Sequence, residues 1–167
     1  DWHSQQIESS LKKKGCKVIK LRFDELQANF QKGRFFLNQE LKKVRGVWLR
    51  FLNNGTLEEI TTKLTFLHLL EEVGVYIHNS PKTVEMTVDK VRTTGLLEIA
   101  LINSPNTLVK FGSIKKLKKK SYLLKPIFGS QGKNISFIKN KSNLKKIKPV
   151  GNVSYLQDFI GDLNQKK

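Results

Sequence analysis

The sequence has 167 residues, of which 38% are hydrophobic and 27% are charged, so it is long enough to bury a core in one domain or in two small ones. No apolar run reaches the roughly 18–20 residues of a membrane span, and the first residues lack the basic and apolar regions of a signal peptide, so neither is predicted. The single cysteine, Cys16, excludes an intrachain disulfide and fits a cytoplasmic location. Because an apolar run follows Cys16, we expect a small buried side chain there.

The net charge of +17 suggests a nucleic-acid-binding protein. However, nearly all the basic residues are lysines, whereas base edges and bidentate phosphate contacts favour arginine. The lysine clusters at 12–14, 115–120 and 145–148 also contain few aromatic residues for stacking. We therefore favour solvated surface lysines without specific nucleic-acid binding, and keep a basic nucleic-acid-binding module without catalysis as the alternative. Weak, salt-sensitive adhesion to polyanions is expected in both cases.

Two helices are predicted in the first eighty residues. Ile7 and Leu11 stand four residues apart, which predicts a short amphipathic helix over 4–14. Thr56 and Glu59 form a capping box, which predicts that a second helix begins there and runs to the glycine at 74.

Three apolar segments, 18–23, 46–50 and 75–78, are predicted strands, while 24–43 has no clear pattern and 53–55 is a predicted turn. Alternating helices and strands favour a parallel sheet covered by helices. In such sheets, ligands bind at the carboxyl ends of the strands, where Arg50 and His78–Asn79 stand.

The second half begins near Pro81, which we expect in the first turn of a helix. Another helix is predicted from Asp89 to about residue 101. Extended segments are predicted over 106–110, 122–126, 135–138 and 153–160, with a lysine-rich turn over 112–120 and a helical turn over 143–147. A shift in composition near Pro81 predicts two domains, 1–80 and 81–167.

Lys125 lies in a predicted apolar strand, on the same face as Leu123. Taking a lone ammonium out of water is costly unless an anion neutralises it. Because no carboxylate is close in the sequence, the partner is either an Asp or Glu of another strand or a bound phosphate.

A loop of sequence Gly129-Ser130-Gln131-Gly132 follows four residues later and joins two predicted strands. Glycines let backbone N–H groups converge on a ligand, and Ser130 adds a hydroxyl donor. A bulged hairpin uses the same residues. Lys125 and this loop together favour the phosphate interpretation, in which the hairpin tip covers a polyphosphate.

Two further segments fit a nucleotide. Asp89 is expected to cap a helix, and Lys90 then extends toward an anion near the helix start, although an ordinary exposed lysine is the simpler explanation for this pair taken alone. The backbone of the extended segment 155–160 can pair with the edge of an adenine. The aliphatic side chains of Leu156 and Ile160 would then sandwich the ring. Its alternative is a plain core strand with Asp158 facing water.

These pieces, in this order, resemble the ATP-grasp superfamily, and most closely its RimK-like ligases. The segment 88–97 is similar to the family's Asp-Lys-x-x-Thr-x-x-Leu-Leu helix, and 104–107 to its Pro-x-Thr step. Leu124-Lys125-Pro126 with the loop 129–133 is similar to its lid strand and phosphate loop. Gln157-Asp158-Phe159-Ile160 is similar to its hinge, with Asp158 where Glu is commoner. Within the family, the start of the chain and the segments 128–132 and 155–157 look most like glutamate ligases linked to tetrahydromethanopterin biosynthesis.

The resemblance implies an α/β fold: an N-terminal parallel pre-ATP-grasp domain, then the ATP-grasp central and lid region with antiparallel strands, incomplete beyond the hinge. It implies a ligase that phosphorylates a carboxylate with ATP and joins the acyl phosphate to an amine, often that of glutamate. Arg50 is a candidate for gripping the substrate carboxylate, with a surface salt bridge as its alternative. The resemblance implies these nucleotide-binding residues: Lys90, Lys125, Gly129, Ser130, Gln131, Gly132, Gln157, Asp158, Phe159 and Ile160.

Magnesium is also implied, but its ligands are not expected in this chain. Mg²⁺ needs carboxylate oxygens, and after Glu98 the only acids are Asp158 and Asp162. The family's spaced Asp and Glu-x-Asn set is expected beyond residue 167, so the chain as it stands is expected to be inactive. The complete enzyme is expected to bind ATP, a carboxylate substrate and an amino acid, with homo-oligomer formation left open.

Overall fold

The computed structural model describes residues 1–32, 34–38, 41, 43–50, 52, 55–114, 116–117, 121–139 and 149–161. Parts of the predicted turns at 53–55 and 112–120 lie outside the described residues, as do the cluster at 145–148, the helical turn at 143–147 and Asp162. The chain divides into two compact units, Asp1–Phe51 with Thr65–Pro81, and Leu52–Leu64 with Lys82–Lys167. The described part holds no helix with the length and apolarity needed to cross a bilayer.

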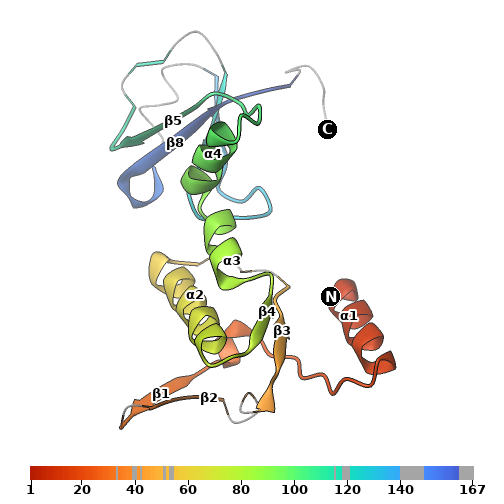
Figure 1. The fold of residues 1–167 in the computed structure, drawn as a ribbon. Helices are drawn as coiled ribbons and strands as arrows, with labels where there is room; N and C mark the ends of the chain where they lie inside the picture. The colour runs from red at the N-terminus through yellow and green to blue at the C-terminus, as the bar shows by residue number, and fades with distance from the viewer. Residues whose placement is uncertain are drawn as a thin grey trace. The chain divides into compact units, whose positions relative to one another are not determined.

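The first unit begins with helix α1, Trp2–Lys13 (Figure 1), which confirms the helix predicted from Ile7 and Leu11. The Asp1 carboxylate accepts a hydrogen bond from the Ser4 N–H at 2.7 Å, so it caps the helix start. The prediction that Cys16 is buried was wrong, because its side chain is exposed.

The strand predicted over 18–23 is also wrong, and this explains the exposure of Cys16: the segment does not pair and ends in a short 3-10 helix, Phe23–Glu25. Its charged side chains bind neighbouring residues instead. Lys20 reaches Glu8 of α1 at 2.6 Å, and Lys12 lies 2.8 Å from the same carboxylate. Hydrogen bonds from Lys12 and Lys20 lower the pKa of Glu8 to about 2.

A hairpin that the sequence did not predict follows, made of β1, Ala28–Gln31, and β2, Arg34–Leu37. The Asn38 side chain closes its open end, because its Oδ1 accepts from the Gln27 N–H at 2.9 Å and its amide donates to the Glu25 carbonyl at 2.8 Å.

A two-stranded parallel sheet, β3 Gly46–Trp48 and β4 Tyr76–His78, confirms the predicted parallel pairing. Helix α2, Leu57–Glu72, connects the strands, and its residues are divided between the two units. The predicted capping box is present, with Thr56 and Glu59 bonded to each other through both backbone N–H groups at 2.7 and 3.2 Å.

The short helix α3, Pro81–Val88, belongs to the second unit from Lys82 onward, and helix α4, Lys90–Ile99, follows it, as predicted. An antiparallel four-stranded sheet follows, in the order β5-β8-β6-β7. Its strands are β5 Thr107–Phe111, β6 Tyr122–Lys125, β7 Ser136–Ile138 and β8 Val153–Asp158, the last preceded by a 3-10 turn at Val150–Asn152. All four predicted extended segments therefore become strands, and the α/β class is confirmed.

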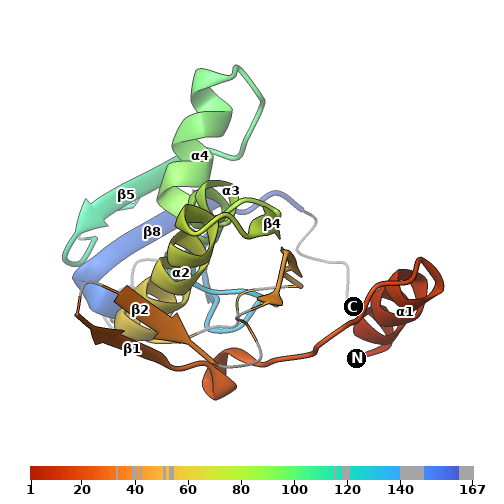
Figure 2. The same cartoon turned by 60° about the horizontal axis from the view of Figure 1, so that its bottom comes forward.

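The two faces of this sheet carry different residues. One face holds a core cluster made of Ile114, Tyr122, Leu124, Ile138 and Leu156. The register places Lys125 opposite Tyr155, and Gln157 opposite both Leu123 and Thr107, so these side chains share the other face. Thr94 of helix α4 lies 2.7 Å from the Tyr155 hydroxyl, so the helix packs on that face. Figures 1 and 2 show the helix beside β5 and β8.

Candidate phosphate-binding site

Two half-buried lysines lie near each other in the second unit. Lys90 is the first residue of α4, and its Nζ donates to the carbonyl oxygens of Gly129 at 2.7 Å and Ile127 at 3.2 Å. Lys125 is the last residue of β6, and its Nζ donates to Oε1 of Gln157 at 2.6 Å. These acceptors leave one N–H of Lys90 and two of Lys125 without a partner in the described part of the chain.

The electrostatics of this pair favour an anion. Burial lowers the pKa of Lys90, and the positive charge of Lys125 lowers it further, while Asp89 opposes both effects. Burial also lowers the pKa of Lys125. Neither ammonium is ion-paired with a carboxylate among the described residues. Two cations held by neutral oxygens therefore form a site that a polyphosphate would compensate.

The start of α4 fixes where Lys90 stands. As predicted, Asp89 is the N-cap, and its Oδ1 accepts from the N–H groups of Val91 at 2.8 Å and Arg92 at 3.1 Å. These two N–H groups are therefore occupied, and the Lys90 side chain is the donor that remains for an anion. A β-bridge between Asp89 and Phe128 joins the helix start to the segment after β6.

The loop between β6 and β7 has the backbone that the sequence suggested. A Cβ on Gly129 would lie 2.9 Å from Cγ of Pro126, so a side chain would push this loop away. Gln131 and Gly132 have φ angles of 57° and 69°, and the Lys133 N–H closes the turn on the Ser130 carbonyl at 3.2 Å. The N–H groups of Gln131 and Gly132 have no acceptor within the described residues, so they are available to a ligand.

A side-chain network behind Lys125 was not predicted. Besides accepting from Lys125, Gln157 donates through Nε2 to Thr107 Oγ1 at 3.0 Å and to the Tyr155 hydroxyl at 3.3 Å. That hydroxyl is 2.7 Å from Thr94 Oγ1 on α4. Strand alternation could have shown that Tyr155 and Gln157 share a face, but only the register of β6 against β8 shows that Lys125 joins them.

The segment predicted to bind adenine already uses several of its backbone N–H groups in hydrogen bonds within the protein. The N–H of Asp158 donates to the Asn106 carbonyl at 2.8 Å, and that of Phe159 to the Ser121 carbonyl at 3.0 Å. Gln157 lies inside the ladder, paired with both neighbouring strands. The Ile160 N–H has no acceptor in the described part, and its side chain is 75% exposed. An adenine edge would therefore find its backbone donor at Ile160.

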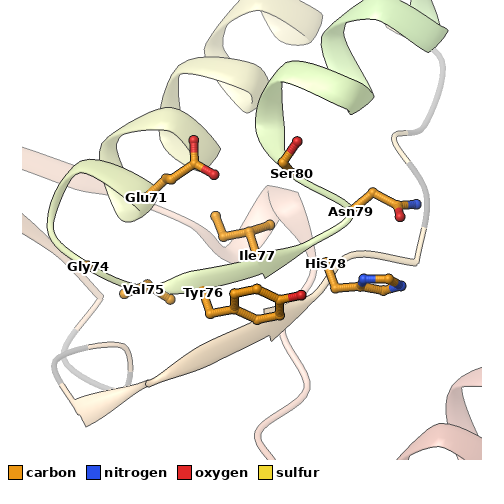
Figure 3. Close-up of a pocket in the computed structure, with 8 residues that line it drawn as sticks. All are labelled: Glu71, Gly74, Val75, Tyr76, Ile77, His78, Asn79 and Ser80. Atoms are coloured by element: carbon orange, nitrogen blue, oxygen red, sulfur yellow. The ribbon is translucent and has the colours of Figure 1, made fainter.

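Arg50 belongs to the first unit, two residues beyond β3, and is exposed. This unit also has a hollow of about 390 Å³ along β4. Figure 3 shows Glu71 and Ser80 on one side of this strand, and the rings of Tyr76 and His78 on the other. The lysine pair belongs to the second unit.

The described residues include no group of three or more His, Cys, Asp and Glu side chains that could hold a metal ion. This part of the chain therefore supplies no cluster of carboxylates for Mg²⁺.

No protein-family profile matches the chain. Comparison with curated sequences finds two relatives that carry the same name. The chain is 26% identical over 180 residues to tetrahydromethanopterin:alpha-L-glutamate ligase of Methanococcus maripaludis, which covers 98% of this chain and 59% of the relative. It is 23% identical to the enzyme of the same name from Methanosarcina acetivorans, over 96% of this chain and 57% of the relative. The chain thus spans less than two thirds of these relatives.

Comparison with solved structures gives the fold. The ATP-grasp ligase PsnB, complexed with a minimal precursor, matches 96% of this chain and 61% of its own with a TM-score of 0.60 and 16% identity. A RimK domain ATP-grasp protein from Sphaerobacter thermophilus matches 61% of this chain and 43% of its own with a TM-score of 0.50 and 18% identity. PsnB has also been solved with AMPPNP and with Mg and ADP. The resemblance to RimK-like ATP-grasp ligases and the partial ATP-grasp fold are confirmed.

Proposed function

We propose that this chain is the ATP-binding part of an ATP-dependent carboxylate–amine ligase that forms an amide or peptide bond. The observation that carries the proposal is the pair Lys90 and Lys125, two half-buried ammoniums whose hydrogen-bond acceptors among the described residues are neutral oxygens. The ATP-grasp fold and the two relatives named as glutamate ligases support ATP as the anion and glutamate, or a similar amino acid, as the amine.

The reaction has two steps. A carboxylate oxygen of the substrate attacks the γ-phosphorus of ATP, and the bond to the β–γ bridging oxygen breaks. ADP is released, and the substrate becomes an acyl phosphate. The amine nitrogen then attacks the acyl carbon, the carbon–oxygen bond to phosphate breaks, and the nitrogen loses a proton. Charge builds up on phosphate oxygens in the first step, so fixed ammonium groups stabilise its transition state. Lys90 and Lys125 would supply that charge.

The other predicted residues have supporting roles in this proposal. The loop from Gly129 through Ser130 and Gln131 to Gly132 would cover the phosphates with its backbone N–H groups. Gln157 would hold the Lys125 side chain beside the phosphates. The segment from Asp158 to Ile160 would hold adenine, with Asp158 and Phe159 shaping the site and Ile160 providing the N–H. Arg50 would contact the substrate carboxylate.

We also propose a domain boundary near residue 80, with one domain over 1–80 and another over 81–167. The magnesium ligands would lie outside the described residues. A cytoplasmic location is part of the same proposal.

Nucleotide binding tests the proposal. Isothermal titration with ATP and Mg²⁺ should show binding to the wild-type protein, and Lys90→Ala or Lys125→Ala should each weaken it by about tenfold or more, because each removes a charge-assisted hydrogen bond. Lys110→Ala is the matched control: Lys110 lies on the same sheet but pairs with Ser154 on the opposite face, so its loss should leave affinity unchanged. Equal affinity of all variants, or no binding to wild type, would overturn the proposal.

The net charge of +17 favours a basic nucleic-acid-binding module as the second candidate. A duplex oligonucleotide titrated under the same conditions separates the two. Tight oligonucleotide binding that does not depend on Lys90 and Lys125, without ATP binding, would support this second candidate in place of the ligase.

A further inference from the structure

We propose that Gln157 is a positioning residue: its neutral amide fixes the Lys125 ammonium in place without neutralising it, so that the charge stays available to a phosphate. Tyr155 and Thr94 hold Gln157 in turn and connect it to α4. This inference rests on the proposed function, because it concerns how that phosphate site is built.

The geometry of the amide supports this role. Oε1 of Gln157 accepts from Lys125 at 2.6 Å, while Nε2 donates to Thr107 Oγ1 and to the Tyr155 hydroxyl at 3.0 and 3.3 Å. Both ends of the amide are therefore bonded, and the N–H groups can face only the two hydroxyls. This fixes the carbonyl oxygen toward the lysine.

The identity of the acceptor matters because of its charge. A glutamate at this position has the same length and would also accept from Lys125, but it would form a buried ion pair. The carboxylate would then neutralise the ammonium and repel the phosphate oxygens at the same place. A neutral amide holds the Lys125 ammonium in position without placing a negative charge beside it.

The network also joins the two lysines mechanically. Tyr155 is 3% exposed, and its hydroxyl is 2.7 Å from Thr94 Oγ1. Thr94 belongs to α4, the helix that begins with Lys90, and Thr107 hydrogen-bonds the Pro105 carbonyl at 2.8 Å. The chain of hydrogen bonds from Lys125 thus reaches the helix that carries the other ammonium.

The substitution Gln157→Glu tests the charge directly. MgATP affinity, measured by isothermal titration, should fall by roughly ten- to a hundredfold, because a charge-assisted contact to phosphate is lost and repulsion is added. Adenosine affinity should stay unchanged, since adenosine has no phosphate. The thermal midpoint of the nucleotide-free protein should stay equal or rise, because Lys125 gains a counter-ion. A merely structural role would lower the midpoint and the affinity for both ligands, and that result would overturn the inference.

A second variant serves if Gln157→Glu fails to fold. Tyr155→Phe keeps the buried ring and removes only the hydroxyl, so the amide loses one of its two acceptors. MgATP affinity should fall by about threefold or more, while adenosine affinity stays unchanged. Unchanged MgATP affinity in this variant would contradict the inference.

The same titrations separate this inference from the proposed function. If wild-type protein does not bind MgATP, the proposed function fails. If wild type binds and Lys125→Ala weakens binding, but Gln157→Glu binds as tightly as wild type, the proposed function stands and only the role of Gln157 is wrong.

Discussion

At the scale of single residues, the phosphate site depends on Lys125, whose ammonium is held by Oε1 of Gln157 at 2.6 Å. Lys125 stood out because an ammonium in an apolar strand needs an explanation, and the structure confirms that it is half-buried. The role of Gln157 could not be foreseen, because it depends on the register that sets Leu123 and Lys125 of β6 against Gln157 and Tyr155 of β8. The sequence alone does not contain that register.

Gly129 gives a prediction at this scale. Gly129→Ala would place Cβ 2.9 Å from Cγ of Pro126, so the loop must shift and carry away the carbonyl that accepts from Lys90. We expect MgATP affinity to fall by about three- to tenfold, measured by isothermal titration. Gly95→Ala is the control, because nothing lies within 4 Å of its Cβ position in α4. Equal affinity of wild type and Gly129→Ala would show that the loop position does not matter.

The two ammoniums also predict a pH dependence. Burial holds the pKa of Lys90 and Lys125 below the ordinary value of 10.5, so they lose their protons at a lower pH than exposed lysines do. Phosphate binds the protonated forms, so the dissociation constant of MgATP should rise with pH before 10.5 is reached. The unfolded chain binds more protons in this range, so the stability of the nucleotide-free protein should rise there instead.

Calorimetric titrations in buffers of different ionisation enthalpy measure this linkage. MgATP binding should take up protons as the pH rises through the lowered pKa values. Binding without proton uptake, with an affinity independent of pH up to about 10, would contradict the assignment.

At the scale of elements, local signals predicted helices and paired strands well. The capping box at Thr56 and the cap at Asp89 mark helix starts that the structure confirms. The segment 18–23 failed because alternation alone does not supply a partner strand. The hairpin of β1 and β2 was missed because its strands have only four residues each and most of the described β1 positions are exposed.

The cap of α4 gives a prediction for stability. Asp89→Ala removes the acceptor of the Val91 and Arg92 N–H groups and should lower the free energy of unfolding by about 1 kcal/mol, measured by urea denaturation. Asp89→Asn should be close to wild type, because asparagine caps equally well. If both variants lose the same stability, the carboxylate charge rather than the cap is responsible.

At the scale of the whole molecule, the order of motifs carried more information than composition. The net charge of +17 pointed toward nucleic acids, whereas the ordered segments from Asp89 to Ile160 pointed to the ATP-grasp fold that the solved structures confirm. The division of α2 between two units could not be predicted, because the sequence signals a helix and not the contacts that its two halves make.

The same charge predicts different responses to salt. Exposed lysines are screened by salt, so affinity for a duplex oligonucleotide should fall by about tenfold or more between roughly 50 and 200 mM salt. Affinity for MgATP, which the half-buried Lys90 and Lys125 would hold, should fall by a smaller factor over the same range of salt. Fluorescence titrations of both ligands over this range measure the two slopes, and an equal slope would mean that ATP binds only to the charged surface.

The central claim is that Lys90 and Lys125 together hold the phosphates of a nucleotide. Quantitative acetylation followed by mass spectrometry, with and without MgATP, tests it at both positions in one experiment. We predict that MgATP protects Lys90 and Lys125 by several-fold, while exposed lysines such as Lys12 and Lys110 react equally in both samples. Protection of neither lysine, or protection confined to exposed lysines, would contradict the account.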